Sequence, residues 1–526
     1  MSRPISIAIL AIVLVGACGS PAPSPSPSTA ASPTPLATPQ PPPSAGTPTP
    51  ANPAPPSATA SATPGATVTT GDIHWSPASS HDTAVVVVPL DYANPGAGTI
   101  KLVVVRRRAT DQAHRIGVLF LNPGGPGGSG VDFIDAADRE VPAVIAQRFD
   151  LVSWDPRGVG LSSGITCPDK TVVAQAEALD PTPTRPEEVA AYRNVFDTVA
   201  AQCQAASGDL LPHLAEANTA RDMDAIRAAM GEATISYWGF SYGTYLGYLY
   251  ATMFPSRLRA AILDGPVDPT LDLAGRDQGQ ARGFQAAFDH QLGLCGASKA
   301  CPFWNGGHPE AAFSALLAGL DKQPLATPGG TVGPGEAVSG VILMLYGSDP
   351  RSLVQALADA QHGNGQQLLA AANFYYEQVQ LGAYLATACI DVARPSSPAE
   401  IDKVLAATRS EAPLFGPLVV LGDAYGCLDW PIAPQPVPAG APPEGLPPVL
   451  VIASTWDPAT PPWGAAPLAK ALGTGVVLMR DGLGHTTGGS ASSNPCLRDA
   501  TAAYLTALTE PAAGTVCKDP PPPFGP

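Results

Sequence analysis

One serine stands between two glycines in WGFSYGTYLG, residues 238–247. The pattern Gly-x-Ser-x-Gly fixes only three positions, so in a glycine-rich chain it carries little weight alone. Its surroundings add more: ATISYW before it predicts a buried strand, and YGTYLGYLYATMF after it predicts a helix that ends before Pro255. A serine on a tight turn from strand to helix exposes its hydroxyl, which favours Ser241 as a nucleophile over a plain turn residue.

A serine nucleophile needs a base, and the base needs an acid that orients it. Among the eight histidines, His485 follows a late predicted strand at a glycine-flanked loop, DGLGHTTGG. Asp457 follows the strand before it, in STWDPATP, although Asp before Pro is also a common turn former. The order Ser, Asp, His is that of α/β hydrolases rather than of chymotrypsin or subtilisin. We therefore predict Ser241, Asp457 and His485 as a catalytic triad.

The glycine-rich segment LNPGGPGGSG, residues 121–130, follows the third predicted strand. It lacks the Gly-Lys-Ser/Thr ending of a phosphate-binding P-loop, which leaves a flexible loop or an oxyanion hole. α/β hydrolases place an oxyanion donor at this point of the chain, and glycines let backbone N–H groups approach an oxyanion closely. We predict the amides of Gly125 and Tyr242 as donors, with the choice of glycine open by one residue.

Continuous Val, Ile and Leu runs alternate with helix-like segments along the catalytic region, which predicts a mostly parallel central sheet covered on both faces. Residues 72–269 and 446–518 form the two parts of this α/β-hydrolase core. Between them, residues 270–445 are amphipathic, helical and Ala- and Gln-rich. Ligands of open α/β sheets bind at the carboxyl edge, so we expect this insertion to be a helical cap over the site.

The first 71 residues differ in composition from the rest of the chain. Arg3 and the apolar run ISIAILAIVLVGAC predict an export signal over residues 1–18, and the residues before Cys18 resemble a bacterial lipobox. Residues 19–71, rich in Pro, Ser, Thr and Ala, predict an extended linker, and residues 519–526 a proline-rich tail. We expect an extracytoplasmic protein held at the membrane by a lipid on Cys18; ordinary signal cleavage with secretion, or an uncleaved anchor, are the alternatives.

Besides Cys18 there are eight cysteines, an even number that suits up to four disulfides in an exported chain. Pairing of sequence neighbours is the simplest proposal, with Cys295 joined to Cys301, although connectivity cannot be deduced from sequence alone. The chain contains no Cys-x-x-Cys and no His-Glu-x-x-His, so no metal site is expected. A net charge of −16 argues against a nucleic-acid partner. The oligomeric state stays open.

Several motifs occur together and in order: NPGGPGGSG, DPRGVGLS, ARDMDAIRAAMG, YWGFSYGTYLGYLYATMFPSRLRAAILDGPVDP, DPATP and GTVC. Across most of residues 72–518 the chain resembles the exported tripeptidyl aminopeptidases of the α/β-hydrolase fold, relatives of prolyl aminopeptidase. The resemblance implies the triad Ser241, Asp457 and His485 and a helical cap that admits a free peptide amino terminus. The sequence departs from the family in GLGH, where Gly-His-Gly-His is usual, and in the cap.

The predicted function is a serine exopeptidase that releases short peptides, tripeptides by resemblance, from free amino termini without a cofactor. An esterase with the same triad is the alternative, and a non-catalytic surface binding protein is a third. An enclosed ammonium needs a carboxylate partner. We predict Asp391 for this role, then Glu377, with Asp423 and Asp429 behind them. A bridge from Cys389 to Cys427 would bring Asp391 and Asp429 into one neighbourhood.

Overall fold

The structure is a computed structural model, and it describes residues 73–77, 80–378, 380–438, 440–487, 493–520 and 524. Cys18, the predicted signal peptide and the proline-rich linker lie outside the described residues. In the described part of the chain, no helix is both long and apolar enough to cross a membrane.

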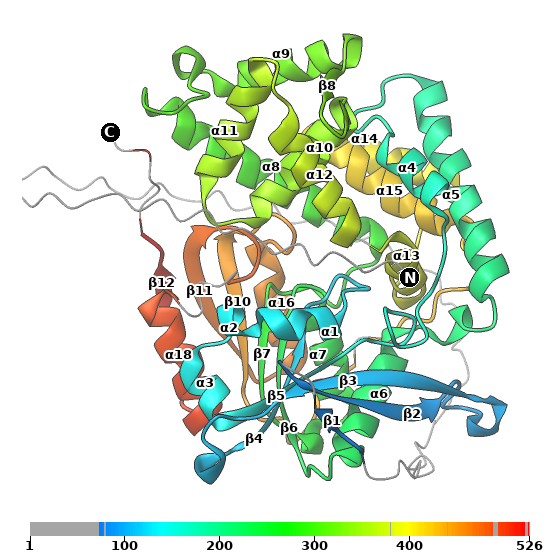
Figure 1. Cartoon of the computed structure of the whole chain (residues 1–526), viewed down its shortest axis with the longest axis vertical. Helices are drawn as coiled ribbons and strands as arrows, with labels where there is room; N and C mark the ends of the chain where they lie inside the picture. The colour runs from blue at the N-terminus through cyan, green and yellow to red at the C-terminus, as the bar shows by residue number, and fades with distance from the viewer. Residues whose placement is uncertain are drawn as a thin grey trace, which may run out of the picture. The chain divides into compact units, whose positions relative to one another are not determined.

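A ten-stranded sheet forms the base of the catalytic region, in the order β1-β2-β3-β5-β4-β6-β7-β10-β11-β12 (Figure 1). From β5 through β12 all neighbouring strands are parallel, whereas β1, β2 and β3 join at one side as antiparallel strands. The strands are β1 (Ser76–Pro77), β2 (Asp82–Pro89), β3 (Thr99–Arg107), β4 (Gly117–Asn122), β5 (Phe149–Trp154), β6 (Ile235–Phe240), β7 (Leu258–Asp264), β10 (Val449–Trp456), β11 (Gly475–Leu483) and β12 (Val516–Lys518). This confirms the predicted mostly parallel sheet.

Helices cover both faces of the sheet, which is why its central strands are apolar along their whole length. One face packs on α6 (Glu216–Ala229), α7 (Gly243–Met253) and α16 (Ala465–Leu472). The other packs on α1 (Gly130–Phe133), α2 (Ala137–Glu140), α3 (Ala143–Arg148) and α18 (Pro495–Ala507). Because β4, β6, β7, β10 and β11 are parallel, the loops that follow them leave the sheet at one edge.

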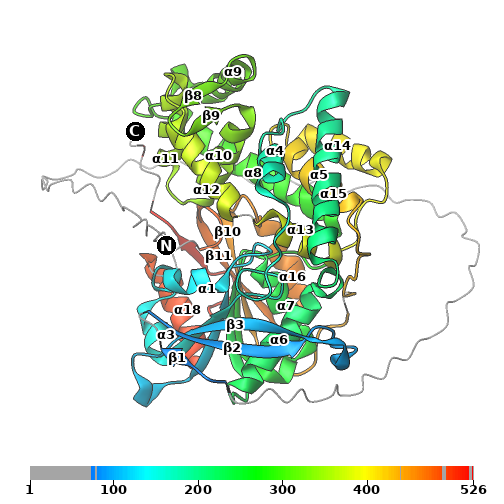
Figure 2. The ribbon, with the colours of Figure 1, turned by 45° about the vertical axis from the view of Figure 1, so that its right-hand side comes forward.

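The cap lies over this edge and has two apolar lobes, which Figure 2 shows side by side. One lobe packs α8 (Leu273–Gly296), α9 (Pro309–Lys322), α10 (Pro334–Tyr346), α11 (Pro350–Gln361) and α12 (Gln366–Gln378), with the hairpin β8 (Leu325–Thr327) and β9 (Gly330–Val332) beside them. The other packs α4 (Lys170–Glu177), α5 (Pro186–Ser207), α13 (Leu381–Asp391), α14 (Pro398–Glu411) and α15 (Gly416–Leu428).

The second lobe contains helices that the sequence analysis assigned to the core. α4 and α5 precede the strand of Ser241, yet they pack against α13 and α15, and the disulfide Cys167–Cys203 ties the start of this segment to α5. The cap is therefore built from residues 270–445 together with an excursion between β5 and α6. Its two parts meet through apolar contacts between segments remote in the sequence.

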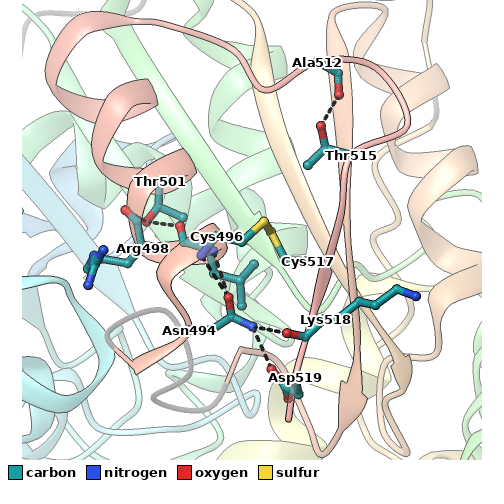
Figure 3. Close-up of a disulfide and its surroundings, with 10 residues drawn as sticks. Asn494, Cys496, Arg498, Thr501, Ala512, Thr515, Cys517, Lys518 and Asp519 are labelled. Carbon is teal, nitrogen blue, oxygen red and sulfur yellow. Dashed lines mark hydrogen bonds between the residues drawn. A yellow bond between two sulfur atoms is a disulfide. The ribbon is translucent and has the colours of Figure 1, made fainter. Parts of the chain in front are cut away.

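Four disulfides join the cysteines in sequence order, which confirms the neighbour pairing: Cys167–Cys203, Cys295–Cys301, Cys389–Cys427 and Cys496–Cys517. The last bridge fastens β12 to the start of α18 (Figure 3). There Asn494 Nδ2 donates to the carbonyl of Lys518 at 3.0 Å and to Asp519 Oδ1 at 2.9 Å. Asp519, which the sequence analysis assigned to the tail, is thus bound to the core.

Candidate active site

Ser241 lies directly after β6, on the turn into α7. Its φ is +56°, a left-handed backbone that a non-glycine residue rarely adopts. Its amide donates to the carbonyl of Asp264 at 2.8 Å, and its own carbonyl accepts from the amide of Thr244 at 2.9 Å. A Cβ at Gly239 would lie 2.3 Å from the carbonyl oxygen of Gly243, so the first glycine of the motif is required by close approach of the backbone. The turn holds the serine half-exposed at the edge of the sheet.

Asp457 follows β10 and is buried, and its carboxylate lies against His485 from the loop after β11. The atoms Asp457 Oδ1 and His485 Nδ1 are 2.8 Å apart. The same carboxylate accepts from the amides of Ala459, Thr460 and Thr486 at 2.8–3.0 Å. Since Nδ1 is paired with the acid, Nε2 is the ring nitrogen that can take up a proton.

The loops of the three predicted triad residues converge at Gly265, immediately after β7. A Cβ placed there would lie 2.6 Å from Thr460 Oγ1, 2.9 Å from Thr486 Cγ2 and 3.5 Å from the amide nitrogen of Ser241. Thr460 Oγ1 is also 3.1 Å from Asp457 Oδ2. The sheet edge thus brings together the elements that carry Ser241, Asp457 and His485.

The cap also touches the histidine. The amide of His485 donates to the carbonyl of Tyr346 at 3.0 Å, and the Tyr346 ring meets the imidazole edge to face, with ring centres 4.8 Å apart. Tyr346 is the last residue of α10. This end of the cap therefore restricts the orientation of the imidazole.

Two buried charged residues that are not among the predicted site residues, Arg480 and Asp264, hydrogen-bond to the loop that contains His485. Arg480 donates to the carbonyls of Leu483 and Thr486, each at 2.8 Å, and pairs with Asp519 at 2.7 Å. Asp264, at the end of β7, accepts from the amide and the hydroxyl of Thr487 at 2.9 and 2.6 Å. Burial raises the pKa of Asp264 to about 7, against the lowering effect of the Thr487 hydrogen bonds. Arg480 and Asp264 each belong to a strand that is otherwise mostly apolar, and this pattern could have identified both residues from the sequence.

The predicted oxyanion loop packs against the turn of Ser241. A Cβ at Gly124 would lie 2.8 Å from the amide nitrogen of Tyr242, so the two backbones are in close contact. The amide of Gly124 is already bonded to Asn122 Oδ1 at 2.9 Å. Among the described residues, the amides of Gly125 and Tyr242 donate to no partner. Both N–H groups are therefore available to an oxyanion.

The two carboxylates predicted to bind an amino terminus lie in different surroundings. Glu377 is exposed on α12. Asp391 is buried at the end of α13, where its Oδ2 accepts from the hydroxyl of Tyr242 and its Oδ1 from the amide of Glu216 at 2.8 Å. Glu377 is therefore not enclosed, and both oxygens of Asp391 are already bonded within the protein.

The Cys389–Cys427 bridge is present, but the expectation that it joins Asp391 and Asp429 is wrong. Asp429 is half-exposed at the surface, 3.7 Å from Arg193, whereas Asp391 is buried on Tyr242. A helix turns about 100° per residue, so a side chain two positions after a cysteine points to the opposite side of the helix from the bridge. The bridge joins the helices without joining these two carboxylates.

A different carboxyl pair is enclosed in the cap. The charge of Asp423 of α15 acts on the buried Asp277 of α8, and Tyr384 donates to Asp423 Oδ2 at 2.7 Å. Burial raises the pKa of Asp423 to about 6, against the lowering effect of its hydrogen bonds, and burial with the Asp423 charge raises that of Asp277 well above its ordinary value. Asp277 Oδ2 is buried without a hydrogen-bond partner among the described residues.

Asp277 is not among the predicted site residues, although the sequence contains a signal for it. The residues Ala281, Phe284 and Phe288 form a buried stripe at helical spacing along α8, and Asp277 continues this stripe one turn earlier. An acid at the head of an apolar stripe is placed where solvent cannot reach it. Such a position costs free energy unless a partner compensates the charge.

The comparisons with known proteins agree with this geometry. Residues 117–308 match the family model described as alpha/beta hydrolase fold, and residues 412–517 match the model described as TAP-like protein. The fold and the polar groups at its carboxyl edge thus define a hydrolase of the α/β class.

Three curated relatives cover most of the chain. Serine protease Hip1 of Mycobacterium tuberculosis is 33% identical over 481 residues, which cover 85% of this chain and 91% of that protein. Tripeptidyl aminopeptidase of Streptomyces lividans is 32% identical over 471 residues, 82% of each chain. Carboxylesterase B of M. tuberculosis is 32% identical over 488 residues, which cover 86% of this chain and 92% of that protein. The chain belongs to the TAP-like family of α/β hydrolases, and it is a serine peptidase.

Proposed function

We propose that the protein is an exopeptidase that removes short peptides, tripeptides first among them, from free amino termini. The name of the Streptomyces relative supports tripeptidyl release. The name of the mycobacterial serine protease supports a peptidase without specifying the length released. We further propose that the enzyme is exported and lipid-anchored at Cys18.

In the proposed mechanism Ser241 Oγ attacks the scissile carbonyl while His485 Nε2 accepts the hydroxyl proton. Asp457 keeps the imidazole in the tautomer with Nδ1 protonated and stabilises the imidazolium that forms. The amides of Gly125 and Tyr242 donate to the oxyanion. His485 then gives its proton to the leaving amine, the C–N bond breaks, and water, deprotonated by His485, hydrolyses the acyl-enzyme to release the short peptide.

The observation that carries the exopeptidase proposal is the carboxyl pair of Asp277, which is buried, and Asp423, which is half-buried. A peptide amine, with an ordinary pKa near about 8, carries charge at neutral pH, and an enclosed ammonium needs a carboxylate partner. Asp277 Oδ2 is buried without a hydrogen-bond partner among the described residues, and burial, assisted by the Asp423 charge, favours a proton on Asp277 against the nearby charge of Arg276. An incoming ammonium would displace that proton and ionise the pair.

The surroundings of the pair support this role, because α8 also contacts the loops at the sheet edge. Gln280 Nε2 donates to the carbonyl of Ala459 at 3.1 Å, two residues after Asp457. The Arg276 guanidinium lies 4.6 Å from the ring centre of Tyr245, on the helix that follows Ser241. An amino terminus held at Asp277 would thus be enclosed by the same helix that covers the proposed catalytic loops.

The test compares free and acetylated tripeptidyl amides, together with a small uncharged ester. Asp277→Asn and Asp423→Asn should raise KM for the free-amino peptide at least tenfold, about 1.4 kcal/mol of binding free energy. Turnover of the ester should stay within twofold, which also shows that the variants fold. Glu377→Gln, an exposed acid of the same cap, is the matched control and should leave the preference unchanged. An undiminished preference in both Asp variants would contradict the proposal.

An esterase is the second candidate, favoured by the relative named carboxylesterase B. The proposed triad would serve an ester equally well, because function resides in the site rather than in the fold. If the ester is turned over and no tripeptidyl amide is, the esterase replaces the exopeptidase. A third candidate, a binding protein without catalysis, fails if a fluorophosphonate labels Ser241.

A further inference from the structure

The first turn of helix α13 contacts the glycine-rich loop of residues 121–130. A Cβ placed at Gly127 would lie 3.1 Å from the Cβ of Ala383 and 3.2 Å from the amide nitrogen of Tyr384. Gly127 is two residues from Gly125 in the same turn, which the bond from the amide of Gly128 to the carbonyl of Gly124 closes at 3.0 Å. The beginning of α13 therefore supports one side of the oxyanion hole.

The same helix reaches the other side of the oxyanion hole at its last residue. Asp391 Oδ2 accepts from the hydroxyl of Tyr242, whose backbone amide is the second proposed donor. Asp391 Oδ1 accepts from the amide of Glu216, at the first residue of α6. Tyr242 and Asp391 are both buried, so the bond is shielded from water. A carboxylate that accepts two such bonds is a rigid support.

Helix α13 is itself held in place by two disulfide-bonded segments. Cys389, two residues before Asp391, is joined to Cys427 of α15. At the other end, a Cβ at Gly382 would lie 1.9 Å from the carbonyl oxygen of Cys167, which is bonded to Cys203. The helix is thus fixed near both ends against neighbours in its lobe, and a shift along its axis would break these contacts.

We propose that α13 sets the separation of the two oxyanion donors and that Asp391 is a positioning residue that acts through the side chain of Tyr242. Asp391 touches neither substrate nor the reacting atoms, and its two oxygens are bonded to protein groups. The inference rests on the proposed function only in the assignment of Gly125 and Tyr242 as donors. Removal of one oxyanion donor lowers kcat roughly 10²–10³-fold. A donor that is present but less firmly positioned should lower kcat by a smaller factor, which should still exceed the effect of a substitution at the protein surface.

The experiment uses Tyr242→Phe, Asp391→Asn and the double variant in the full-length enzyme. Each single variant should lower kcat about tenfold for both the tripeptidyl amide and the small ester, with KM within twofold. A tripeptidyl trifluoromethyl ketone, which forms a tetrahedral adduct with serine, should bind the variants more weakly by the same factor as kcat/KM falls. Binding of the free tripeptide product should be unchanged. The double variant should be no slower than the slower single variant, because both changes remove one bond.

Asp429→Asn is the matched control, because Asp429 also lies two residues after a cysteine of the same bridge but is solvent-exposed. It should leave every parameter unchanged. If the Asp391→Asn variant fails to fold, the Tyr242→Phe variant alone tests the inference, because this substitution removes only the hydroxyl and keeps the backbone amide. Unchanged kcat and unchanged ketone binding in Tyr242→Phe would overturn the inference.

The outcomes for the inference and for the proposed function can be separated. If Asp391→Asn raises KM for free-amino peptides alone and leaves ester kcat intact, Asp391 binds the substrate amine, and the positioning role is refuted while the exopeptidase stands. If the wild-type enzyme hydrolyses only esters, and Tyr242→Phe slows them as expected, the exopeptidase is refuted and the positioning role stands.

Discussion

Asp457 holds His485 in one orientation: Oδ1 lies 2.8 Å from Nδ1, while the other oxygen accepts from the amide of Thr486, the residue next to the histidine. The carboxylate therefore fixes both the ring and its backbone. The expected consequence of Asp457→Asn is a protein that binds substrate but turns it over several hundredfold to ten-thousandfold more slowly, because the amide favours the wrong imidazole tautomer. Steady-state kinetics with the tripeptidyl amide measures this decrease in kcat. If Asp457→Asn lowers kcat less than Asp264→Asn does, Asp264 is the orienting acid instead.

Ser241→Ala should reduce peptide and ester hydrolysis by several orders of magnitude while the thermal midpoint changes little, since it removes one half-exposed hydroxyl. Mass spectrometry after treatment with a fluorophosphonate should show one adduct on the wild-type enzyme and none on the variant. Residual activity near a tenth of wild type would exclude Ser241 as the nucleophile.

The preference for free over acetylated peptides should decrease both at low pH and at high pH. Burial raises the pKa of Asp423 to about 6, so the carboxyl pair is neutralised and binds an ammonium poorly as the pH falls below that value. Above about 8 the peptide amine loses its own charge. Both substrates depend equally on the protonation of the proposed triad, so this effect cancels in the ratio of kcat/KM for the free peptide to kcat/KM for the acetylated peptide. The ratio should be greatest between pH values of about 6 and about 8. A flat ratio from pH 5 to 9 would contradict an ionic contact.

Glu216 should destabilise the folded protein progressively as the pH rises. Burial, assisted by the charge of Asp391, raises its pKa from 4.5 to about 8, so the folded state binds more protons than the unfolded chain in that range. The free energy of unfolding therefore falls with increasing pH between these values. Besides burial, the groups that shift the pKa of Glu216 are Asp391, Thr219, Asp222 and Arg157.

Glu216→Gln removes this titration and keeps the backbone amide that donates to Asp391. Its thermal midpoint relative to wild type should be clearly higher at pH 8 than at pH 5, as measured by calorimetry. An equal difference at the two pH values would show that Glu216 does not titrate in the folded protein.

Cys18→Ala should move the mature protein from the membrane fraction to the soluble exported fraction, because a lipid on that cysteine is the proposed anchor. Immunoblots of cell fractions, with the Ser241→Ala variant as a matched control that keeps the cysteine, measure the shift. Unchanged fractionation would favour an uncleaved apolar segment instead.

The fold and the meeting of the three predicted triad residues at one sheet edge could be predicted because their signals are local. Each central strand is a continuous apolar run, the glycines around Ser241 mark a tight turn, and Asp457 and His485 directly follow strands. Parallel pairing then brings the loops to one edge without any further information. The same reasoning paired the cysteines correctly, because neighbouring cysteines in the chain lie on packed neighbouring elements.

The cap acids could not be ranked from sequence, because their environment depends on contacts between helices remote in the chain. Asp391 lies near a cysteine in the sequence, but the packing of the cap directs its side chain onto Tyr242. Asp277 and Asp423 are 146 positions apart, and only the packing of α8 on α15 brings them together. The excursion of α4 and α5 into the cap was missed for the same reason, since an amphipathic helix does not reveal which lobe it covers.

The Cys496–Cys517 bridge spans an exposed stretch, residues 508–510 and 512–514, between α18 and β12. A protease that nicks the chain there would leave β12 covalently attached, so Asp519 would still neutralise Arg480 and the His485 loop would keep its support. The same nick in a reduced molecule would free the C-terminal fragment and leave a buried cation without its counter-charge, a cost of several kcal/mol. Tolerance of cleavage at this stretch thus depends on one sulfur–sulfur bond, and therefore on an oxidising environment.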